Sequence, residues 1–269
     1  RSSWAGADIY KRQIWAMTPQ ASTHHQNSDD TLRGISSMAT RALLAQLLSD
    51  YAATGGPPVN MLSIGGVDAL QRLQGGEAFD VAVLASDAIA RLVTSGHAHA
   101  DSVTALLHSG VAVAVQTVQT NQDGQGGQAP RFSADLSTEA SVKAAVLAAP
   151  SISYSTGPSG VALAQLFERW GIAQQVAART ITPPPGTPVA SLVASGQAAL
   201  GFQQLSELLH APGIDVLGPL PDAIRITTTF SACVLTACQH VGAAQALIAY
   251  LASDAAAPAK RAQGMTPAS

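Results

Sequence analysis

The sequence predicts an α/β fold of two lobes, each a mostly parallel sheet flanked by helices, joined by two crossover strands. Strand and helix signals alternate along most of the 269 residues, and repeated strand–helix units are typical of parallel sheets with helices on both faces. The run Phe79–Ala85 is continuously apolar, as expected for a parallel strand that is buried on both faces. Two β-type runs, Val111–Gln116 and Ile224–Val234, are the candidates for the strands that pass between the lobes.

Up to residue 116 the predicted elements follow a regular order. Leu32–Ile35 is a short apolar run that ends in Ser36-Ser37, and leucines at helical spacing then predict a helix over Met38–Tyr51. The segment Gly55-Gly56-Pro57-Pro58 ends this helix. The next elements predicted are a strand at Val59–Ile64, a helix at Val67–Gln74, the strand Phe79–Ala85, a helix at Asp87–Thr94 and a strand at Val111–Val115.

A stretch rich in Gly and Gln, Thr117–Asp135, interrupts this alternation and predicts a surface loop. The alternation resumes beyond it. The elements predicted there are helices at Thr138–Leu147, Val161–Trp170, Val189–Ser195, Leu205–His210 and Ala243–Ala252, and strands at Ser151–Tyr154, Ala198–Phe202, Ile214–Leu217 and Ile224–Leu235.

The crossover strands divide the chain into its lobes. Residues 31–115 plus 228–269 form the predicted lobe one, and residues 116–227 form lobe two. Residues 1–30 are polar and without periodicity, so we expect a disordered or artefactual tail. This segment also lacks the apolar core of a signal peptide, and the native export signal is therefore expected to be missing from this sequence.

Composition narrows the classes of partner. The chain is 47% hydrophobic and 12% charged, with a formal net charge of −3. It has no basic stripe for a nucleic acid to bind, and no apolar run reaches the roughly 18 residues of a membrane span. We therefore expect neither a nucleic acid nor a membrane as partner. We also expect a monomer. The pair His24-His25 falls short of the three or four ligands of a metal site, and we predict no metal or cofactor. Cys233 and Cys238 are expected to be free, buried thiols.

Candidate ligand-binding residues follow the predicted strands, at the point where each strand gives way to a helix. Ligands of open α/β sheets bind beyond the carboxyl ends of strands, and a helix start offers free N–H donors and about half a positive charge. A plain helix cap or turn is the alternative at each position. The residues predicted to bind a small anion are Ser36, Ser37, Gly65, Gly66, Ser159 and Gln204.

Five segments in this order resemble the periplasmic molybdate-binding proteins of ABC importers. They are Gly34–Thr40, Ala78–Asp87, Gly157–Leu163, Ser195–Phe202 and Ala249–Gly264. The resemblance implies the type II periplasmic binding fold, a periplasmic location, an ABC permease as partner and a small oxyanion or organic carboxylate as ligand. Family members that bind molybdate usually have a Ser-rich second loop where this chain has Gly65-Gly66, and often a Tyr where it has Gln204. These departures weigh against molybdate itself.

A branch of the same fold resembles aconitate isomerase, which implies an alternative function. Interconversion of cis- and trans-aconitate moves a proton across an allylic system, so a base must lie near the substrate carbon. Glu207 and Asp68 are the candidates for this base. The alternative for Glu207 is a solvated helix residue, and the alternative for Asp68 is a first-turn acid that the helix dipole favours. Arg41 is a further candidate for a carboxylate partner, or else faces water.

Overall fold

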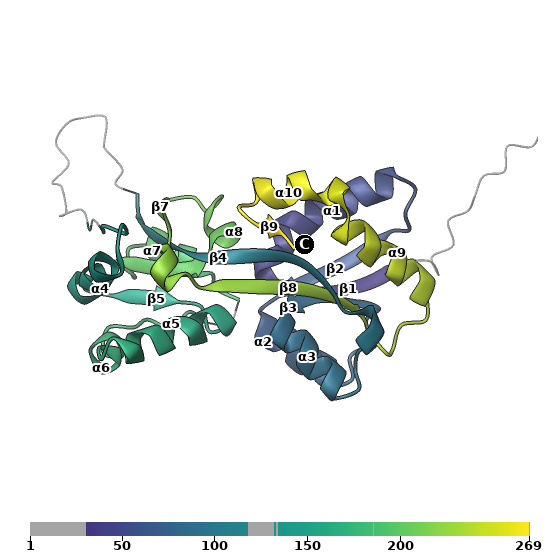
Figure 1. Cartoon of the computed structure of the whole chain (residues 1–269), viewed down its shortest axis with the longest axis horizontal. Coiled ribbons are helices and arrows are strands. Elements are labelled where there is room, and N and C mark those ends of the chain that lie inside the picture. Colours follow the sequence, from purple (N-terminus) through teal and green to yellow (C-terminus); the bar gives the residue numbers. More distant parts are fainter. Residues whose placement is uncertain (1–30, 118–131, 133, 185, 269) are drawn as a thin grey trace, which may run out of the picture.

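The computed structural model describes residues 31–117, 132, 134–184 and 186–268, and shows two lobes side by side (Figure 1). The predicted tail with His24-His25 and most of the predicted loop Thr117–Asp135 lie outside the described residues. Two strands, β4 (Thr104–Gln116) and β8 (Thr227–Val234), run through both lobes and join them. The two-lobed α/β architecture predicted from the sequence is therefore confirmed.

Lobe one contains a sheet in the order β2-β1-β3-β8-β4. Strand β1 pairs in parallel with β2 and with β3, whereas β8 runs antiparallel to both β3 and β4. The strands and short helices not yet given are β1 (Leu32–Ser37), β2 (Val59–Ile64), β3 (Val81–Ala85), β9 (Thr266–Pro267), η2 (Met38–Thr40), η3 (Ala100–Ser102) and η5 (Asp254–Ala256). The α-helices are α1 (Arg41–Ala53), α2 (Gly66–Gln74), α3 (Ser86–Thr94), α9 (Val241–Ala252) and α10 (Ala257–Ala262).

Lobe two continues the sheet from β4 to β6 and β5. Here β5 and β6 are parallel, and β4 runs antiparallel to β6 and to β7. The elements are β5 (Ile152–Tyr154), β6 (Leu200–Gln204), β7 (Ile214–Pro219), η4 (Asp222–Ile224), α4 (Glu139–Ala148), α5 (Pro158–Arg169), α6 (Ala173–Ala177), α7 (Val189–Ala194) and α8 (Leu205–Leu208).

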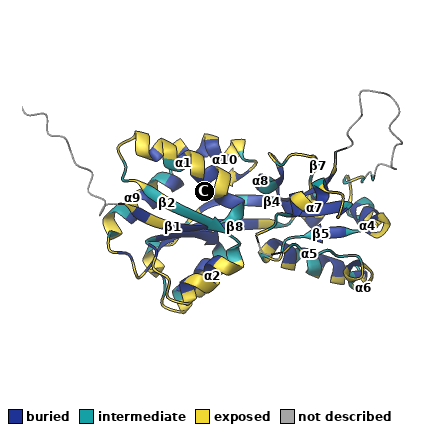
Figure 2. Ribbon diagram, turned by 180° about the vertical axis from the view of Figure 1, so that it is seen from behind, coloured by how far each residue is buried: buried dark blue, intermediate teal, exposed yellow. Residues whose placement is uncertain are grey.

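Each lobe has its own hydrophobic core, with the strands buried and the outer faces of the helices exposed (Figure 2). On β4, Leu107 packs in the core of lobe one and Val111 in that of lobe two. On β8, Phe230 packs in lobe one. The two cores therefore separate on β4 between residues 107 and 111. The predicted lobe boundaries, 31–115 plus 228–269 for lobe one and 116–227 for lobe two, stay predictions.

Several elements differ from the sequence prediction in extent, and three of these differences concern the two crossover strands and the start of α5. Strand β4 begins at Thr104 rather than Val111, because its first half contains polar and small residues that hide the strand pattern. Helix α5 begins at Pro158 rather than Val161, since Pro suits the first turn of a helix. Strand β8 begins at Thr227, after the turn η4. The short helix α6 was not predicted.

Both cysteines are free and buried, as predicted. Within the described ranges, no helix combines the length and the apolar character that a membrane crossing requires.

Candidate functional site

The carboxyl ends of β1, β2 and β3 form one edge of lobe one. In the strand register Ser37 lies opposite Ile64, and Ser36 lies opposite Val83. Helices η2, α2 and α3 begin directly after these strands. The register then carries this edge across the sheet, because Ala85 lies opposite Phe230 on β8. Three helix starts of lobe one therefore line up at a single level of the sheet.

The carboxyl ends of β5 and β6 form the corresponding edge of lobe two, and they point back toward lobe one. Strand β6 is antiparallel to β4 and places Gln204 opposite Val111, and α5 and α8 begin just beyond β5 and β6. Phe230 in turn lies opposite Leu107 on β4, so the lobe-one edge reaches this strand at Leu107. The two edges are therefore four residues apart along β4, which is about 13 Å of strand.

The helices are divided between the two sides of the crossover strands. In Figures 1 and 2, α2 and α5 lie on one side, and α1, α8 and α10 lie on the other. On the second side the lobes are in contact, because Ser206 Oγ on α8 donates to the carbonyl oxygen of Ala39 at 2.8 Å, and Gly264 packs tightly against Leu205. On the first side, α2 and α5 begin just beyond the ends of β2 and β5, at the two edges described above.

The structure brings Ser37 and the Gly65-Gly66 pair together. Ser37 Oγ caps η2 by accepting from the backbone N–H of Ala39 at 3.3 Å, and a Cβ atom on Gly66 would lie 4.0 Å from this Oγ. Ser36 is fully buried instead, and its hydroxyl is hydrogen-bonded to the Ser63 hydroxyl at 2.8 Å. Of the two adjacent serines, Ser37 is thus the one placed at the edge.

Ser159 lies in the first turn of α5, where it is buried and hydrogen-bonded through Oγ to the hydroxyl of Ser155 at 3.0 Å. The next residue, Gly160, allows the helix start to approach the strand end closely. A Cβ atom on Gly160 would overlap the carbonyl oxygen of Ser155 and lie 2.7 Å from its carbonyl carbon. This turn therefore needs glycine for steric reasons.

Gln204 is held at the end of β6 with only 4% of its surface exposed. Its Nε2 donates to Thr228 Oγ1 at 2.8 Å, but its Oε1 is buried and has no partner among the described residues. The same holds for Oγ of Ser109, which lies opposite Thr228 in the β4–β8 register. A buried polar atom without a partner costs about 1–3 kcal/mol of stability. Gln204 Oε1 and Ser109 Oγ can therefore each form a further hydrogen bond at the junction of the lobes.

Glu207 is half-buried and accepts a hydrogen bond from Gln203 Nε2 at 2.7 Å. Gln203 Oε1 in turn accepts from the backbone N–H of Ala190 in the first turn of α7, at 3.3 Å. Burial raises the pKa of the Glu207 carboxyl to about 7, and the hydrogen bond from Gln203 opposes this only in part. The structure thus pairs Glu207 with Gln203, toward α7, rather than with Gln204.

Replacing Glu207 by Gln should remove a pH dependence of stability. The folded pKa lies above the value of about 4.3 for an unfolded chain, so the folded state binds this proton more tightly. The free energy of unfolding of the wild type should therefore fall between about pH 5 and pH 8, by about 2 kcal/mol from this group. Urea unfolding of both proteins at pH 5 and pH 8 measures the difference, and an equal pH dependence in the variant would contradict this assignment.

Asp68 and Arg41 are both exposed. The Asp68 carboxylate folds back over the turn before α2, where its Oδ2 would lie 3.2 Å from a Cβ atom on Gly65. Asp68 is therefore beside the Gly65-Gly66 pair, and its catalytic role stays a prediction. Arg41 begins α1 and faces water, which is the second of the two alternatives for it.

Two residues near this level, Ser86 and His108, were missed by the sequence analysis. Ser86 begins α3, and its Oγ donates to the carbonyl oxygen of Thr229 at 3.1 Å and lies 2.7 Å from the hydroxyl of Ser231. His108 Nδ1 lies 2.9 Å from Thr229 Oγ1. The strand-end rule that selected Ser37 also applies to Ser86, which follows a buried strand. No such sequence signal points to His108, because the first half of β4, which contains it, was not predicted as a strand.

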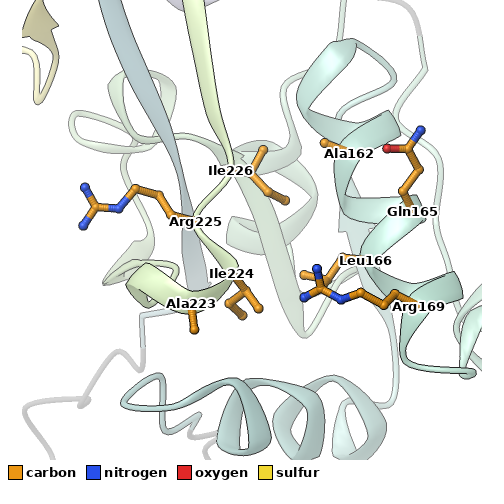
Figure 3. Close-up of a pocket in the computed structure, with 8 residues that line it drawn as sticks. All are labelled: Ala162, Gln165, Leu166, Arg169, Ala223, Ile224, Arg225 and Ile226. Carbon is orange, nitrogen blue, oxygen red and sulfur yellow. The ribbon is translucent and has the colours of Figure 1, made fainter.

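A cavity of about 300 Å³ lies elsewhere on lobe two, between α5 and the segment from η4 to β8 (Figure 3). Its two arginines are both in ion pairs: Arg169 with Glu139 at 3.0 Å, and Arg225 with Asp222. Its lining contains none of the predicted ligand-binding residues. The lining residues are Ala162, Gln165, Leu166, Arg169, Ala223, Ile224, Arg225 and Ile226.

Comparison with known proteins assigns the chain to a family. The sequence model of one family, described as bacterial extracellular solute-binding protein, matches residues 32–266. An aconitate isomerase of a Pseudomonas species is 38% identical over 197 residues, which cover 73% of this chain and 70% of the relative.

Solved structures agree on the fold at lower identity. The periplasmic molybdate-binding protein of Azotobacter vinelandii matches with a TM-score of 0.70 and 17% identity, covering 88% of this chain and 100% of the other. The sulfate-binding protein of Mycobacterium tuberculosis H37Rv matches with a TM-score of 0.67 and 13% identity, covering 88% and 86%. The chain therefore belongs to the family of bacterial extracellular solute-binding proteins and has the type II periplasmic binding fold that its sequence predicts.

Proposed function

We propose that the protein binds a small organic polycarboxylate between its two lobes, in the periplasm. The observation that carries this proposal is the strand register, by which the carboxyl edges of both lobes face each other along β4. Five helices or turns begin at these edges, and their N–H groups suit an anion. Ser37, Gly66, Ser159 and Gln204 are the residues to which we assign contact with the ligand.

An organic carboxylate fits the groups at the edges better than molybdate does. The glycines Gly65 and Gly66 supply backbone N–H groups but no hydroxyl. The side-chain amide of Gln204 has an unused acceptor in Oε1, which can receive a hydrogen bond from a ligand hydroxyl, a protonated carboxyl or a bridging water. A fully ionised anion, whether aconitate or molybdate, has no proton to donate to Oε1 and reaches it through such a water, so the preference for a carboxylate rests on the second loop, where glycines replace hydroxyl side chains.

We assign to this site the interconversion of cis- and trans-aconitate. The support is the 38% identity to an aconitate isomerase over most of both chains, against 13–17% to the molybdate- and sulfate-binding proteins. The second candidate is a receptor that delivers the same anion to an ABC permease, and membership of the solute-binding family favours it. Both functions require the same site and the same ligand class, and they differ only in turnover.

An ultraviolet assay with cis-aconitate, paired with thermal unfolding, tests the proposal. The full chain should convert cis- to trans-aconitate. A bound ligand at 100 times its dissociation constant should add about 2.7 kcal/mol to the stability, which raises the melting temperature by about 5–11 °C in a chain of this size. Citrate, molybdate, tungstate and sulfate serve as comparison anions.

Each outcome of this assay separates the candidates. Turnover of cis-aconitate supports the isomerase. A melting shift with aconitate but no turnover supports the receptor instead. A shift with molybdate or sulfate alone would contradict the assignment of an organic carboxylate, and no shift with any of these anions would contradict the site itself.

A further inference from the structure

His108 lies on β4, between the two edges that face each other. Its register partner on β8 is Thr229, and Val111, opposite Gln204, lies three residues further along the same strand. The imidazole is half-buried. Because side chains alternate along β8, His108 and Thr229 share the face of Ser231 and of Ser86 at the start of α3, whereas Thr228 and its partner Gln204 lie on the other face. The imidazole therefore lies on the side of the crossover strands where α2 and α3 are found (Figure 1).

A chain of hydrogen bonds fixes the orientation of the His108 ring. Nδ1 of His108 lies 2.9 Å from Thr229 Oγ1. The backbone of Thr229 is held in turn, because Ser86 Oγ donates to its carbonyl oxygen at 3.1 Å and Ser86 is hydrogen-bonded to the buried Ser231 at 2.7 Å. Since Ser86 is the first residue of α3, this chain links the imidazole to one of the helix starts at the site.

We propose that His108 carries the proton in the isomerisation of aconitate, a proposal that rests on the function proposed above. When Nδ1–H donates to Thr229 Oγ1, the lone pair of Nε2 is available as a base. In the described part of the chain, no hydrogen bond occupies Nε2. One ring nitrogen is thus used for positioning, and the other is left for the substrate.

The proton transfer balances without a further reactant. Nε2 takes a proton from the methylene carbon next to the double bond, and the electron pair of that C–H bond forms the new double bond. The electrons of the old double bond move onto the far carbon and its carboxylate, and Nε2 then returns the proton to that carbon. One C–H bond breaks, one forms, and the double bond moves by one carbon. The transient charge on the carboxylate faces helix N–H groups, which stabilise it.

The two acids considered from the sequence are placed less favourably for this step. Glu207 is hydrogen-bonded to Gln203, which faces α7. Asp68 lies exposed over Gly65 at the start of α2. The register places His108, Ser109 and Gly110 of β4 between the two edges, and of these three His108 is the residue with a basic side chain.

The variant His108→Gln tests the proposal, because an amide can still bond to Thr229 Oγ1 but does not carry a proton. Loss of a general acid–base group lowers turnover by about 100-fold or more. We therefore expect kcat for cis-aconitate to fall at least that far, while the dissociation constant measured by calorimetry changes by less than about threefold, because only the transfer step is removed.

His97→Gln is the matched control. His97 is also half-buried, and its Nδ1 lies 2.9 Å from a hydroxyl, that of Ser95, but it sits in the turn after α3. This variant should keep wild-type turnover. A second readout is exchange of the substrate methylene protons in D₂O, which the wild type should catalyse and His108→Gln should not.

The outcomes separate this inference from the function on which it rests. Wild-type turnover in His108→Gln overturns the role of His108 and leaves the isomerase standing. An inactive wild type that binds aconitate overturns both. Should His108→Gln fail to fold, His108→Asn is measured by the same criteria, and retained turnover in that variant likewise overturns the proposal.

Discussion

Gly160→Ala is expected to destabilise the protein by about 3 kcal/mol and to abolish binding of the anion. The added methyl group would overlap the carbonyl oxygen of Ser155, which belongs to the backbone and cannot rotate away. Inserting a methyl group into such a packed position usually costs about 1–3 kcal/mol. The start of α5 must then move, and the hydroxyl pair of Ser155 and Ser159 moves with it.

Gly157→Ala is the control for this prediction. Gly157 lies three residues earlier in the same turn and has a negative φ of −80°, and a Cβ atom there would meet nothing within 4 Å. Urea unfolding and calorimetric titration with trans-aconitate should show a near-normal protein. If Gly160→Ala binds as tightly as Gly157→Ala, the close approach at this helix start does not matter for the site.

Gln204→Leu is expected to weaken ligand binding by at least tenfold and to change stability by less than about 1 kcal/mol. The substitution removes one hydrogen bond, from Nε2 to Thr228, and also removes the buried Oε1 that has no partner. These two effects on stability oppose each other. The ligand contact, in contrast, has no replacement in leucine.

The neighbouring variant Gln203→Leu should give the opposite result. Gln203 is equally buried, at 4% exposed, but both ends of its amide are used, by Ala190 and by Glu207. Its loss leaves these groups unpaired, so stability should fall by about 1–3 kcal/mol, whereas affinity should change little. Equal affinities for the two variants would show that Gln204 does not touch the ligand.

Much of the fold could be predicted from the sequence, because its buried strands and amphipathic helices have distinct hydrophobic patterns. Val59–Ile64 is a strand with the predicted bounds, and the start of α7 at Val189 was also predicted. The first half of β4 could not be predicted in this way. Its residues His108, Ser109 and Gly110 lie between Leu107 of one core and Val111 of the other, so the apolar pattern of a strand is interrupted there.

The candidate site was predictable only in part. The strand-end rule selected Ser37, Gly66, Ser159 and Gln204 as candidates, because it needs no more than the order of elements, and their role in binding stays a prediction. It did not distinguish Ser36 from Ser37, since that difference depends on which hydroxyl meets Ser63 inside the sheet. The register across β4, which places the two edges opposite each other, involves residues far apart in the chain and has no local signal.

A crystal structure of the protein with trans-aconitate tests the central claim most directly. We predict that the anion lies between the two edges, with carboxylates at the starts of η2, α2 and α5. Gln204 and His108 should approach it from opposite faces of β8, with His108 Nε2 within about 3.5 Å of a substrate carbon. An anion bound instead between Arg169 and Arg225, in the cavity beside α5, with the space between the edges holding only water, would contradict the claim.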